Sequence, residues 1–583
     1  MAEQPIPKTP EEVFKLFNKG AQDFFQTFAA NQGQEMFKVF NQAWATLTTQ
    51  SLQNPQQWLD MLMQYQQNQM KLWMNLWGMP TGGDKNQPVA SPAPGDRRFM
   101  SEDWQENPVF DFLKQSYLLS SDFLMQTAEN MPLDEDNQKK LRFYTKYFID
   151  AMSPSNFALT NPDVMRQAIE TKGQSLVDGL HNLLKDMEKG RISMTDESAF
   201  ELGKNLAITP GAVIFENELI QLIQYSPSTD TVSDVPLLIV PPSINKFYIL
   251  DLQPHNSFVK YTVDQGNTVF LISWVNPGVE HKDYGWDDYL ELGVFKALDI
   301  IKAVTEAKKI NTVSWCVGGT ILASALAVLK AKKQDDMIAS ATFFTTMVDF
   351  SEPGDLGIFI DETQMKQREM RLEQNGILSG KDLALAFSML RANDLIWSYV
   401  VNNYLKGQTP TPFDILYWNS DSTNLPSNMY RYYIRNMYME NKLIEPDALT
   451  MCGVPVNLSN VDVPAYFLST IDDHIAPWKT TFTTTRLFKG PVKFVLGASG
   501  HIAGVINPPA KNKRSYWTDG EFSQDADHWL ATAKSNPGSW WPHWDTWLKA
   551  LGGEMIDPPE TLGNATYSEI EPAPGRYVMK RID

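Results

Sequence analysis

The chain has little of what several protein classes need. Its 583 residues include only 2 cysteines, Cys316 and Cys452, which argues against a disulfide framework and favours a reducing compartment. Acidic residues outnumber basic ones by 69 to 50, giving a formal net charge of −19. This balance argues against general nucleic-acid binding, which needs a basic surface. An anionic substrate would have to be met by a local cluster of Lys and Arg.

Long apolar runs and metal-binding patterns are also missing. No stretch of about 18 apolar residues occurs, so we expect no membrane span. Residues 1–20 contain Pro, Glu and Lys and lack the continuous apolar segment of a signal peptide, so we expect a cytoplasmic protein. The chain has 7 histidines, and five of them show no pairing with Cys or a carboxylate at metal-ligand spacing: His181, His255, His281, His528 and His543. No metal site is expected. No glycine-rich phosphate loop is present.

The N-terminal part of the chain has helical patterns and few strand signals. Residues 1–78 predict an amphipathic helical region, whose apolar positions include Phe14, Phe17, Phe24, Phe25 and Phe28. These helices either pack on themselves or the next domain, or present an apolar face to a hydrophobic surface or partner helix. Residues 79–95 are rich in Pro and Gly and predict a flexible linker. Residues 96–206 predict a helical N-terminal domain.

From residue 207 to 583, short apolar runs alternate with helical stretches. The strand-like runs are 237–240, 269–273, 312–314, 339–345, 465–469 and 493–496. This alternation predicts an α/β domain with a mostly parallel sheet and helices on both faces. Residues from about 350 to 455 are aromatic and helix-prone and interrupt the alternation. We expect them to form a cap inserted over the carboxyl edge of the sheet.

The most informative motif is SWCVGG at residues 314–319, between a strand-like run and a helix-like run. A sharp strand-to-helix turn needs small residues on both sides of its tip, and Ser314, Gly318 and Gly319 meet that need. The pattern is the nucleophile elbow of α/β-hydrolases, with Cys316 where most have Ser. Such a turn points a helix N-terminus at the side chain, which favours a thiolate.

A base and an acid follow in the order that this fold requires. In α/β-hydrolases the chain order is nucleophile, acid, histidine, each on a loop after a strand. Asp473 follows the run 465–469, and His501 follows the run 493–496 on a glycine-flanked loop. Each residue alone is more often structural, but the three in order predict a triad of Cys316, Asp473 and His501. His474 is the competing base, although it adjoins the acid and cannot easily turn back to meet it.

An oxyanion hole should come from the Val317 N–H and from a second N–H in the loop after an early strand. Residues 241–245 (PPSIN) occupy that position. Proline has no N–H, so Ser243 or Ile244 would be the donor. The alternative is a rigid Pro-Pro turn without a role in chemistry.

Together, these residues resemble the class I, single-subunit poly(3-hydroxyalkanoate) synthases. The similar stretches run from about residue 96 to the C-terminus and comprise residues 241–248, 314–319, 391–397, 412–421, 473–475, 500–504, 538–542 and 571–577. Two positions depart from the family pattern. Ser314 stands where the family has Gly, and Ser243 stands where relatives often have Cys.

The resemblance implies an acyltransferase that polymerises (R)-3-hydroxyacyl-CoA into polyester, with release of CoA and a covalent intermediate on Cys316. It favours short-chain 3-hydroxybutyryl units, and it implies a homodimer on the surface of cytoplasmic polymer granules. CoA is part of the substrate and a product, so no separate cofactor is expected. Cys316, Asp473 and His501 fall on the family's catalytic positions.

The remaining candidate residues are weaker. Trp418 falls on a family position near the site or the dimer contact. Lys246 and Arg391 are candidates for a cationic patch that would meet the CoA phosphates, and Asn245 and His474 are further substrate or cap candidates. Two other functions stay open: a Cys-dependent thioesterase or esterase on the same fold, and a granule-associated scaffold with an inactive hydrolase domain.

Overall fold

The computed structural model describes residues 55–79, 87–522 and 525–581. The predicted phenylalanine stripe at 14–28 and residues 80–86 of the predicted linker lie outside the described residues. The chain divides into two compact units. One comprises the described residues up to Thr195 together with Ser388–Thr411, and the other comprises Asp196–Phe387 together with the described residues from Pro412 onward.

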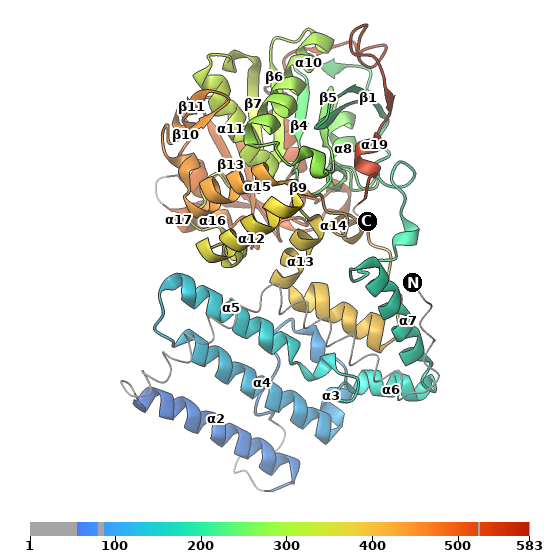
Figure 1. The fold of residues 1–583 in the computed structure, drawn as a ribbon, viewed down its shortest axis with the longest axis vertical. Helices are drawn as coiled ribbons and strands as arrows, with labels where there is room; N and C mark the ends of the chain where they lie inside the picture. The colour runs from blue at the N-terminus through green and yellow to red at the C-terminus, as the bar shows by residue number, and fades with distance from the viewer. Residues whose placement is uncertain (1–54, 80–86, 523–524, 582–583) are drawn as a thin grey trace. The chain divides into compact units, whose positions relative to one another are not determined.

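The first unit is helical. Its longer helices α2 (Pro55–Leu76), α4 (Pro108–Glu129) and α5 (Glu135–Ala151) lie side by side (Figure 1). Tyr65 of α2 stacks on Phe123 of α4, with ring centroids 4.8 Å apart. The Asn107 side chain accepts the Val109 N–H at the start of α4, where Pro108 occupies the first turn. The shorter helices are α3 (Asp103–Glu106), α6 (Pro162–Glu170) and α7 (Gln174–Lys189).

Residues 388–411 lie within the predicted cap insertion, yet they pack in the helical unit. Their π-helical segment Val400–Leu405 runs along α7, where Tyr404 Oη donates to Asp186 Oδ2 at 2.8 Å. A Cβ atom on Gly179 would lie 1.9 Å from the Tyr404 carbonyl oxygen, so only glycine fits where the two segments meet. The segment therefore interrupts the predicted insertion, because its contacts are with α7.

The second unit contains an 11-stranded sheet of order β15-β14-β13-β12-β7-β6-β4-β5-β2-β1-β17. Its centre is parallel, which confirms the predicted α/β class. The predicted strand-like runs correspond to the central strands β4 (Leu237–Val240), β5 (Val269–Trp274), β6 (Ile310–Trp315), β7 (Ile338–Phe344), β12 (Ala465–Thr470) and β13 (Val492–Gly497).

The antiparallel strands at the two edges were not predicted from the sequence. One edge holds β1 (Gly211–Glu216), β2 (Ile220–Tyr225) and β17 (Glu571–Pro572), and the other holds β14 (Ser515–Thr518) and β15 (Lys534–Pro537). Strand β15 reads KSNP and carries no apolar alternation. Its pairing with β14, rather than its own composition, makes it a strand.

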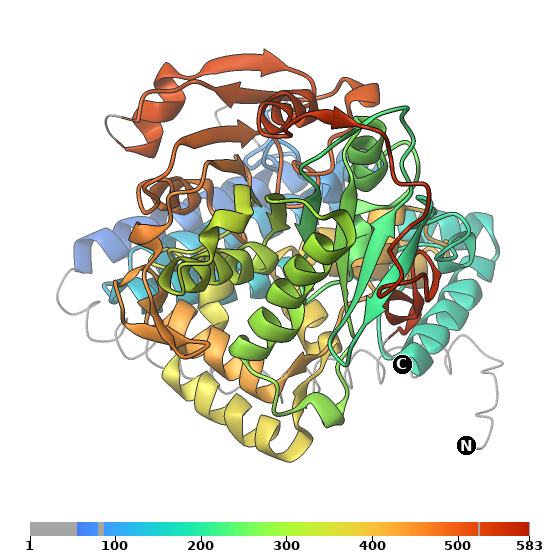
Figure 2. The same cartoon turned by 90° about the horizontal axis from the view of Figure 1, so that it is seen from above.

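Helices lie on both faces of this sheet (Figure 2), and its buried apolar side chains fall into two main clusters. Along β4, Leu238 and Val240 pack in one cluster with residues of α10 (Lys296–Thr305) and α11 (Val317–Ala331). Leu237 and Ile239 point the other way, into a cluster that includes α8 (Phe258–Asp264) and α18 (Trp541–Lys549). Successive strand residues face opposite sides, so the helix layers cover both faces.

The register of the central strands brings their carboxyl ends to one edge. Ser314 of β6 pairs with Val240 of β4 on one side and with Phe343 of β7 on the other, and Leu468 of β12 pairs with Phe344. Ligand sites in such sheets lie beyond the carboxyl ends of the strands. The loops after β4, β6, β7 and β12 therefore meet at this edge.

Candidate active site

Cys316 is at the tip of the turn between β6 and α11. Its backbone has φ 52° and ψ −127°, a strained conformation for a residue with a side chain. A Cβ atom on Gly318 would lie 2.4 Å from the Val240 carbonyl oxygen, and one on Gly319 would lie 2.0 Å from Thr346 Oγ1. Glycine at both positions is what allows α11 to begin this close to the sheet, as a nucleophile elbow requires.

Ser314 fits the elbow without a visible distortion. Its side chain is buried, and its Oγ donates a hydrogen bond to the Thr342 carbonyl oxygen of β7 at 2.9 Å. The hydroxyl thus points along the sheet to the neighbouring strand, and its polar group is satisfied. The structure therefore explains how serine replaces the expected glycine.

Asp473 and His501 form a buried pair beside Cys316. His501 Nδ1 lies 2.7 Å from Asp473 Oδ2, and the other carboxylate oxygen accepts the N–H groups of Ile475 and Ala476 at 2.9 and 2.8 Å. The carboxylate is therefore fixed by backbone donors, and it orients the imidazole. With Nδ1 engaged by Asp473, the remaining ring nitrogen is available to the Cys316 thiol, which is close enough to help raise the pKa of the imidazole.

The proton affinity of His501 reflects both neighbours. Burial alone would lower the pKa of the imidazole, but the negative charge of Asp473, the charge of Cys316 and the hydrogen bonds to both raise this pKa to about 10. A histidine with this proton affinity favours the state in which the Cys316 proton has moved to it, an imidazolium beside a thiolate. This arrangement suits transfer of the thiol proton to the histidine.

The oxyanion candidates lie against the elbow. Val317 is the first residue of α11, where an N–H has no intrahelical partner. A Cβ on Gly318 would also lie 2.5 Å from the Pro241 carbonyl oxygen, so the loop after β4 touches the elbow directly. Ile244 lines the same cavity as Cys316 and Val317, whereas Ser243 is buried and does not line it. This placement makes the loop after β4 a suitable source of the second N–H.

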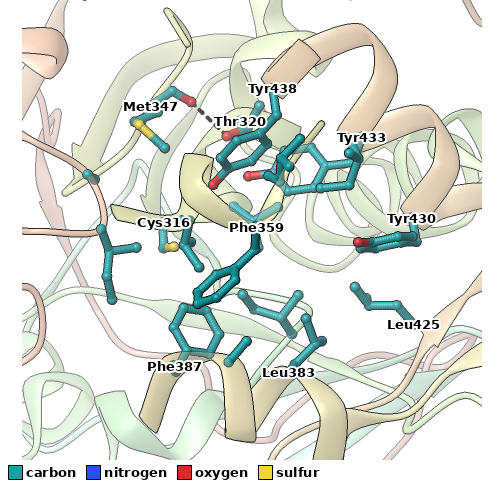
Figure 3. Close-up of a pocket in the computed structure, with 18 of the residues that line it drawn as sticks. Cys316, Thr320, Met347, Phe359, Leu383, Phe387, Leu425, Tyr430, Tyr433 and Tyr438 are labelled. Atoms are coloured by element: carbon teal, nitrogen blue, oxygen red, sulfur yellow. Dashed lines mark hydrogen bonds between the residues drawn. The ribbon is translucent and has the colours of Figure 1, made fainter. Parts of the chain in front are cut away.

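Cys316 opens into an apolar cavity of about 80 Å³. Figure 3 shows the thiol beside Phe359 and Phe387, with Tyr438 and Tyr433 across the cavity. Most of the wall comes from the parts of the predicted cap insertion that remain in this unit, including Leu356, Ile360, Leu383, Ala386, Leu425 and Ile434. The insertion thus supplies side chains over the carboxyl edge of the sheet.

Several residues of this cavity were not predicted from the sequence. Tyr433 directly precedes a π-helical segment (Ile434–Met439) and Tyr438 lies within it, and such segments are often found at functional sites. Burial, and then the charge of Cys316, raise the pKa of Tyr438, so its phenol stays neutral. Thr320 Oγ1 donates to the Met347 carbonyl oxygen at 2.8 Å (Figure 3). The clustering of tyrosines at 430–438 was a visible signal, but periodicity alone could not place them at the thiol.

Lys246 and Trp418 lie together, away from the cavity wall. Lys246 Nζ is buried and pairs with Asp421 Oδ1 at 2.9 Å, and it donates to the carbonyl oxygens of Val578 and Lys580 at 2.8 Å. Trp418 Nε1 donates to the Lys246 carbonyl oxygen at 2.7 Å. The expectation that Lys246 meets CoA phosphates is therefore not supported, because its ammonium group is enclosed and already partnered.

The other candidates are not gathered at Cys316 either. Arg391 belongs to the helical unit, where it pairs with Asp394 at 3.1 Å. Asn245 forms an isolated bridge with Ser422. The His474 carbonyl oxygen accepts the Asp355 N–H at 3.0 Å, and only the residues after it, Ile475 and Ala476, reach the cavity wall. His501 is thus the histidine that the structure brings to the acid.

The described residues show neither a metal-binding cluster nor a membrane-spanning helix. In residues 55–79, 87–522 and 525–581, no group of three or more His, Cys, Asp or Glu side chains could hold a metal ion. Within the same ranges, no helix combines the length and the apolar character that crossing a membrane requires.

Comparison with known proteins identifies the family. Residues 95–262 match the model of the poly-beta-hydroxybutyrate polymerase (PhaC) N-terminus, and residues 236–508 match the alpha/beta hydrolase fold. A solved structure of DcsB with a substrate analogue is only distantly similar, with a TM-score of 0.32 and 14% identity over 51% of this chain and 92% of that chain. This likeness is too distant to support a conclusion.

Curated relatives are much more similar. The poly(3-hydroxyalkanoate) polymerase subunit PhaC of Cupriavidus necator is 48% identical over 88% of each chain. The protein of the same name from Rhizobium meliloti is 46% identical over 86% of this chain and 82% of its own. The poly(3-hydroxyalkanoate) polymerase of Methylorubrum extorquens is 46% identical over 86% and 83%. This chain therefore belongs to the poly(3-hydroxyalkanoate) polymerase family, whose catalytic part has the α/β-hydrolase fold.

Proposed function

We propose that this acyltransferase joins (R)-3-hydroxyacyl units, taken from CoA thioesters, into a polyester through an acyl intermediate on Cys316. One observation carries the proposal: a cysteine at the tip of a nucleophile elbow adjoins a buried His501–Asp473 pair and opens into an apolar cavity. The names of the relatives support the product class. The small cavity, about 80 Å³, supports a short acyl chain.

Acylation is the first step. His501 takes the proton of the Cys316 thiol, and the sulfur attacks the thioester carbonyl. The negative charge that develops on the carbonyl oxygen is stabilised by the Val317 N–H and by an N–H of Ser243 or Ile244. The carbon–sulfur bond to CoA breaks, and the CoA thiolate receives the proton from His501. One thioester replaces another, so the acyl group remains activated.

Ester formation is the second step. The 3-hydroxyl of one acyl unit attacks the thioester carbonyl of another, His501 accepts the hydroxyl proton, and the departing thiolate is reprotonated. Cys452 is a poor second nucleophile, since burial and the charges of Asp287 and Glu291 raise its pKa to about 12. We infer that each chain works with a single thiolate, so the growing ester and the incoming unit alternate between Cys316 and CoA.

Water is the competing nucleophile, and the cavity wall opposes it. Aromatic and aliphatic side chains surround the thiol, among them Phe359, Phe387 and Met347. A wall of this kind disfavours water beside the acyl-enzyme, which favours transfer to an alcohol over hydrolysis. This feature favours the polymerase over a thioesterase on the same fold.

The experiment that tests the proposal follows two products of purified protein and 3-hydroxybutyryl-CoA. We expect CoA release and insoluble polyester to rise together, and Cys316→Ala to abolish both. Soluble 3-hydroxybutyric acid without polymer would indicate a thioesterase. Polymer formation by Cys316→Ala, in a host with no other polymerase, would exclude Cys316 as the nucleophile.

The homodimer and the granule surface belong to the same proposal. Helix α2 exposes Met63 and Met70, whose spacing of seven residues places them along one side of the helix, and the exposed Trp77 directly follows the helix. An exposed apolar stripe supports contact with a hydrophobic polymer surface. Partition of the protein between purified granules and buffer, with and without Met70→Glu, measures this contact, and sedimentation measures the oligomeric state.

A further inference from the structure

Thr345 lies beside the nucleophile although no part of the proposed mechanism uses it. It is the residue directly after β7, next to Phe344, whose carbonyl oxygen accepts the Cys316 N–H at 2.9 Å. Its other neighbour, Thr346, donates from Oγ1 to the Cys316 carbonyl oxygen at 3.3 Å. Thr345 also lines the cavity into which Cys316 opens. The residue is thus part of the wall around the reacting atoms.

The backbone of Thr345 is held in an unfavourable conformation. Its φ is 41°, a value that β-branched residues rarely adopt. The Thr345 N–H donates to the Leu468 carbonyl oxygen of β12 at 2.7 Å, which fixes the residue to the neighbouring strand. Strain of this kind persists where the surroundings impose it, and it gathers at binding sites.

The hydroxyl of Thr345 is unsatisfied. The residue is 0% exposed, and its Oγ1 has no hydrogen-bond partner. Among the cavity-lining residues that the structure describes, it is the one with a buried, unpartnered polar side-chain atom. By contrast, Thr320 donates to Met347, and Arg368 donates to Tyr430 Oη at 2.6 Å. A buried hydroxyl without a partner is costly, so a ligand that supplies one would be favoured.

We propose that Thr345 binds the 3-hydroxyl group of the acyl unit. This inference rests on the proposed function and names a determinant of its substrate class. A 3-hydroxyacyl thioester brings two polar groups into the apolar cavity. The oxyanion donors take the carbonyl oxygen, and the 3-hydroxyl, on the second carbon beyond the carbonyl, still needs a partner. A threonine hydroxyl can donate to it and accept from it.

This contact would discriminate between acyl groups. A site built to hydrogen-bond a substrate hydroxyl disfavours the analogue that lacks it, because the protein group is then left unpaired. Thr345 would thus favour 3-hydroxyacyl thioesters over simple acyl thioesters. The hydrogen bond also orients the hydroxyl before it becomes the nucleophile of ester formation, and no bond is broken in the process.

The test compares Thr345→Val with wild type in single turnovers, with enzyme in excess over 3-hydroxybutyryl-CoA or butyryl-CoA. Acid-quenched samples are analysed for released CoA. We expect Thr345→Val to slow acylation by 3-hydroxybutyryl-CoA about tenfold and to leave acylation by butyryl-CoA unchanged. Thr345→Ser keeps the hydroxyl and should retain the wild-type ratio of the two rates.

Thr484→Val is the matched control. Thr484 is also 0% exposed with an unpartnered Oγ1, but it does not line the cavity. Both valine variants should melt at or above the wild-type temperature, because each loses an unsatisfied buried hydroxyl. Only Thr345→Val should change the ratio of the two acylation rates.

Three results would overturn the inference. The first is that, while wild-type protein is active, Thr345→Val slows acylation by the two thioesters equally or slows neither. Another is loss of the rate ratio in Thr345→Ser. The third is that wild-type protein releases no CoA from either thioester. This result would overturn the proposed function as well, whereas the first two would overturn only the inference about Thr345.

Discussion

His501 lies between a carboxylate and a thiol, and both neighbours favour its protonated form. Its pKa in the folded protein, about 10, lies above its ordinary value of 6.5. The folded state therefore binds this proton more tightly than the unfolded state. The resulting contribution to stability is complete below pH 6.5, and it is lost as the pH rises through about 10.

The titration of His501 can be measured directly by NMR of protein with ¹³C-labelled histidine. We expect an alkaline midpoint near 10 in wild type. Cys316→Ala removes one of the two groups that raise this pKa, so the midpoint should fall, and Asp473→Asn should lower it further. A midpoint at or below 6.5 in wild type would contradict the assigned pairing.

The sequence was enough to predict the roles of some residues and not of others. Cys316, Asp473 and His501 could be predicted because two signals are readable without a structure: the order of the three along the chain, and the position of each after a strand-like run. Lys246 and Thr345 show the limit. Lys246 adjoins the oxyanion loop in sequence, but its side chain turns inward to Asp421, and nothing before the fold reveals that Thr345 keeps an unpartnered hydroxyl at the cavity.

At the scale of elements, the elbow depends on how closely α11 approaches the loop after β4. In Gly318→Ala, the added Cβ would meet the Val240 carbonyl oxygen at 2.4 Å, and backbone must move to relieve the contact. We expect the free energy of unfolding to fall by about 1–3 kcal/mol and CoA release to be lost as the elbow shifts. Denaturant unfolding and the CoA assay measure the two effects.

Gly285→Ala is the control for this substitution, since its added Cβ would meet nothing closer than 3.9 Å. It should leave CoA release close to wild type. If Gly318→Ala kept wild-type stability and activity, the elbow would not depend on the close approach of α11 to the loop after β4.

The loop after β4 is also tied to the C-terminal segment. The buried ammonium group of Lys246 pairs with the Asp421 carboxylate and donates to the backbone carbonyl oxygens of Val578 and Lys580. Lys246→Met leaves the Asp421 carboxylate without its main partner, so we expect a loss of about 3–5 kcal/mol in the free energy of unfolding. The double variant Lys246→Met/Asp421→Asn should lose less than the sum of the single variants. If the losses of the two single variants simply added up in the double variant, Lys246 and Asp421 would not be energetically coupled.

Elements differed in how far the sequence could predict them. The central strands were predictable because strands buried on both faces read as continuous apolar runs. The edge strand β15 and the placement of 388–411 were not, since both depend on a partner distant in sequence. The helix-prone composition of the cap insertion was visible, but its division between two units was not.

For the whole molecule, charge is the dominant property. A net charge of −19 opposes the approach of an anionic CoA thioester, and salt screens this repulsion over about 10 Å at 0.1 M ionic strength. We therefore expect kcat/KM for 3-hydroxybutyryl-CoA to rise a few-fold between about 10 and 150 mM salt. An uncharged thioester of N-acetylcysteamine should show no such rise. A fall with salt would instead indicate a local cationic cluster at the entrance.

The central claim is that Cys316 carries the acyl group, and one measurement tests it most directly. Purified protein is mixed briefly with 3-hydroxybutyryl-CoA, quenched in acid and digested, and the peptides are analysed by mass spectrometry. We predict a 3-hydroxybutyryl thioester, alone or extended, on the peptide that contains Cys316, and none in His501→Gln. Release of CoA by wild-type protein with Cys316 unmodified throughout the time course would contradict the account.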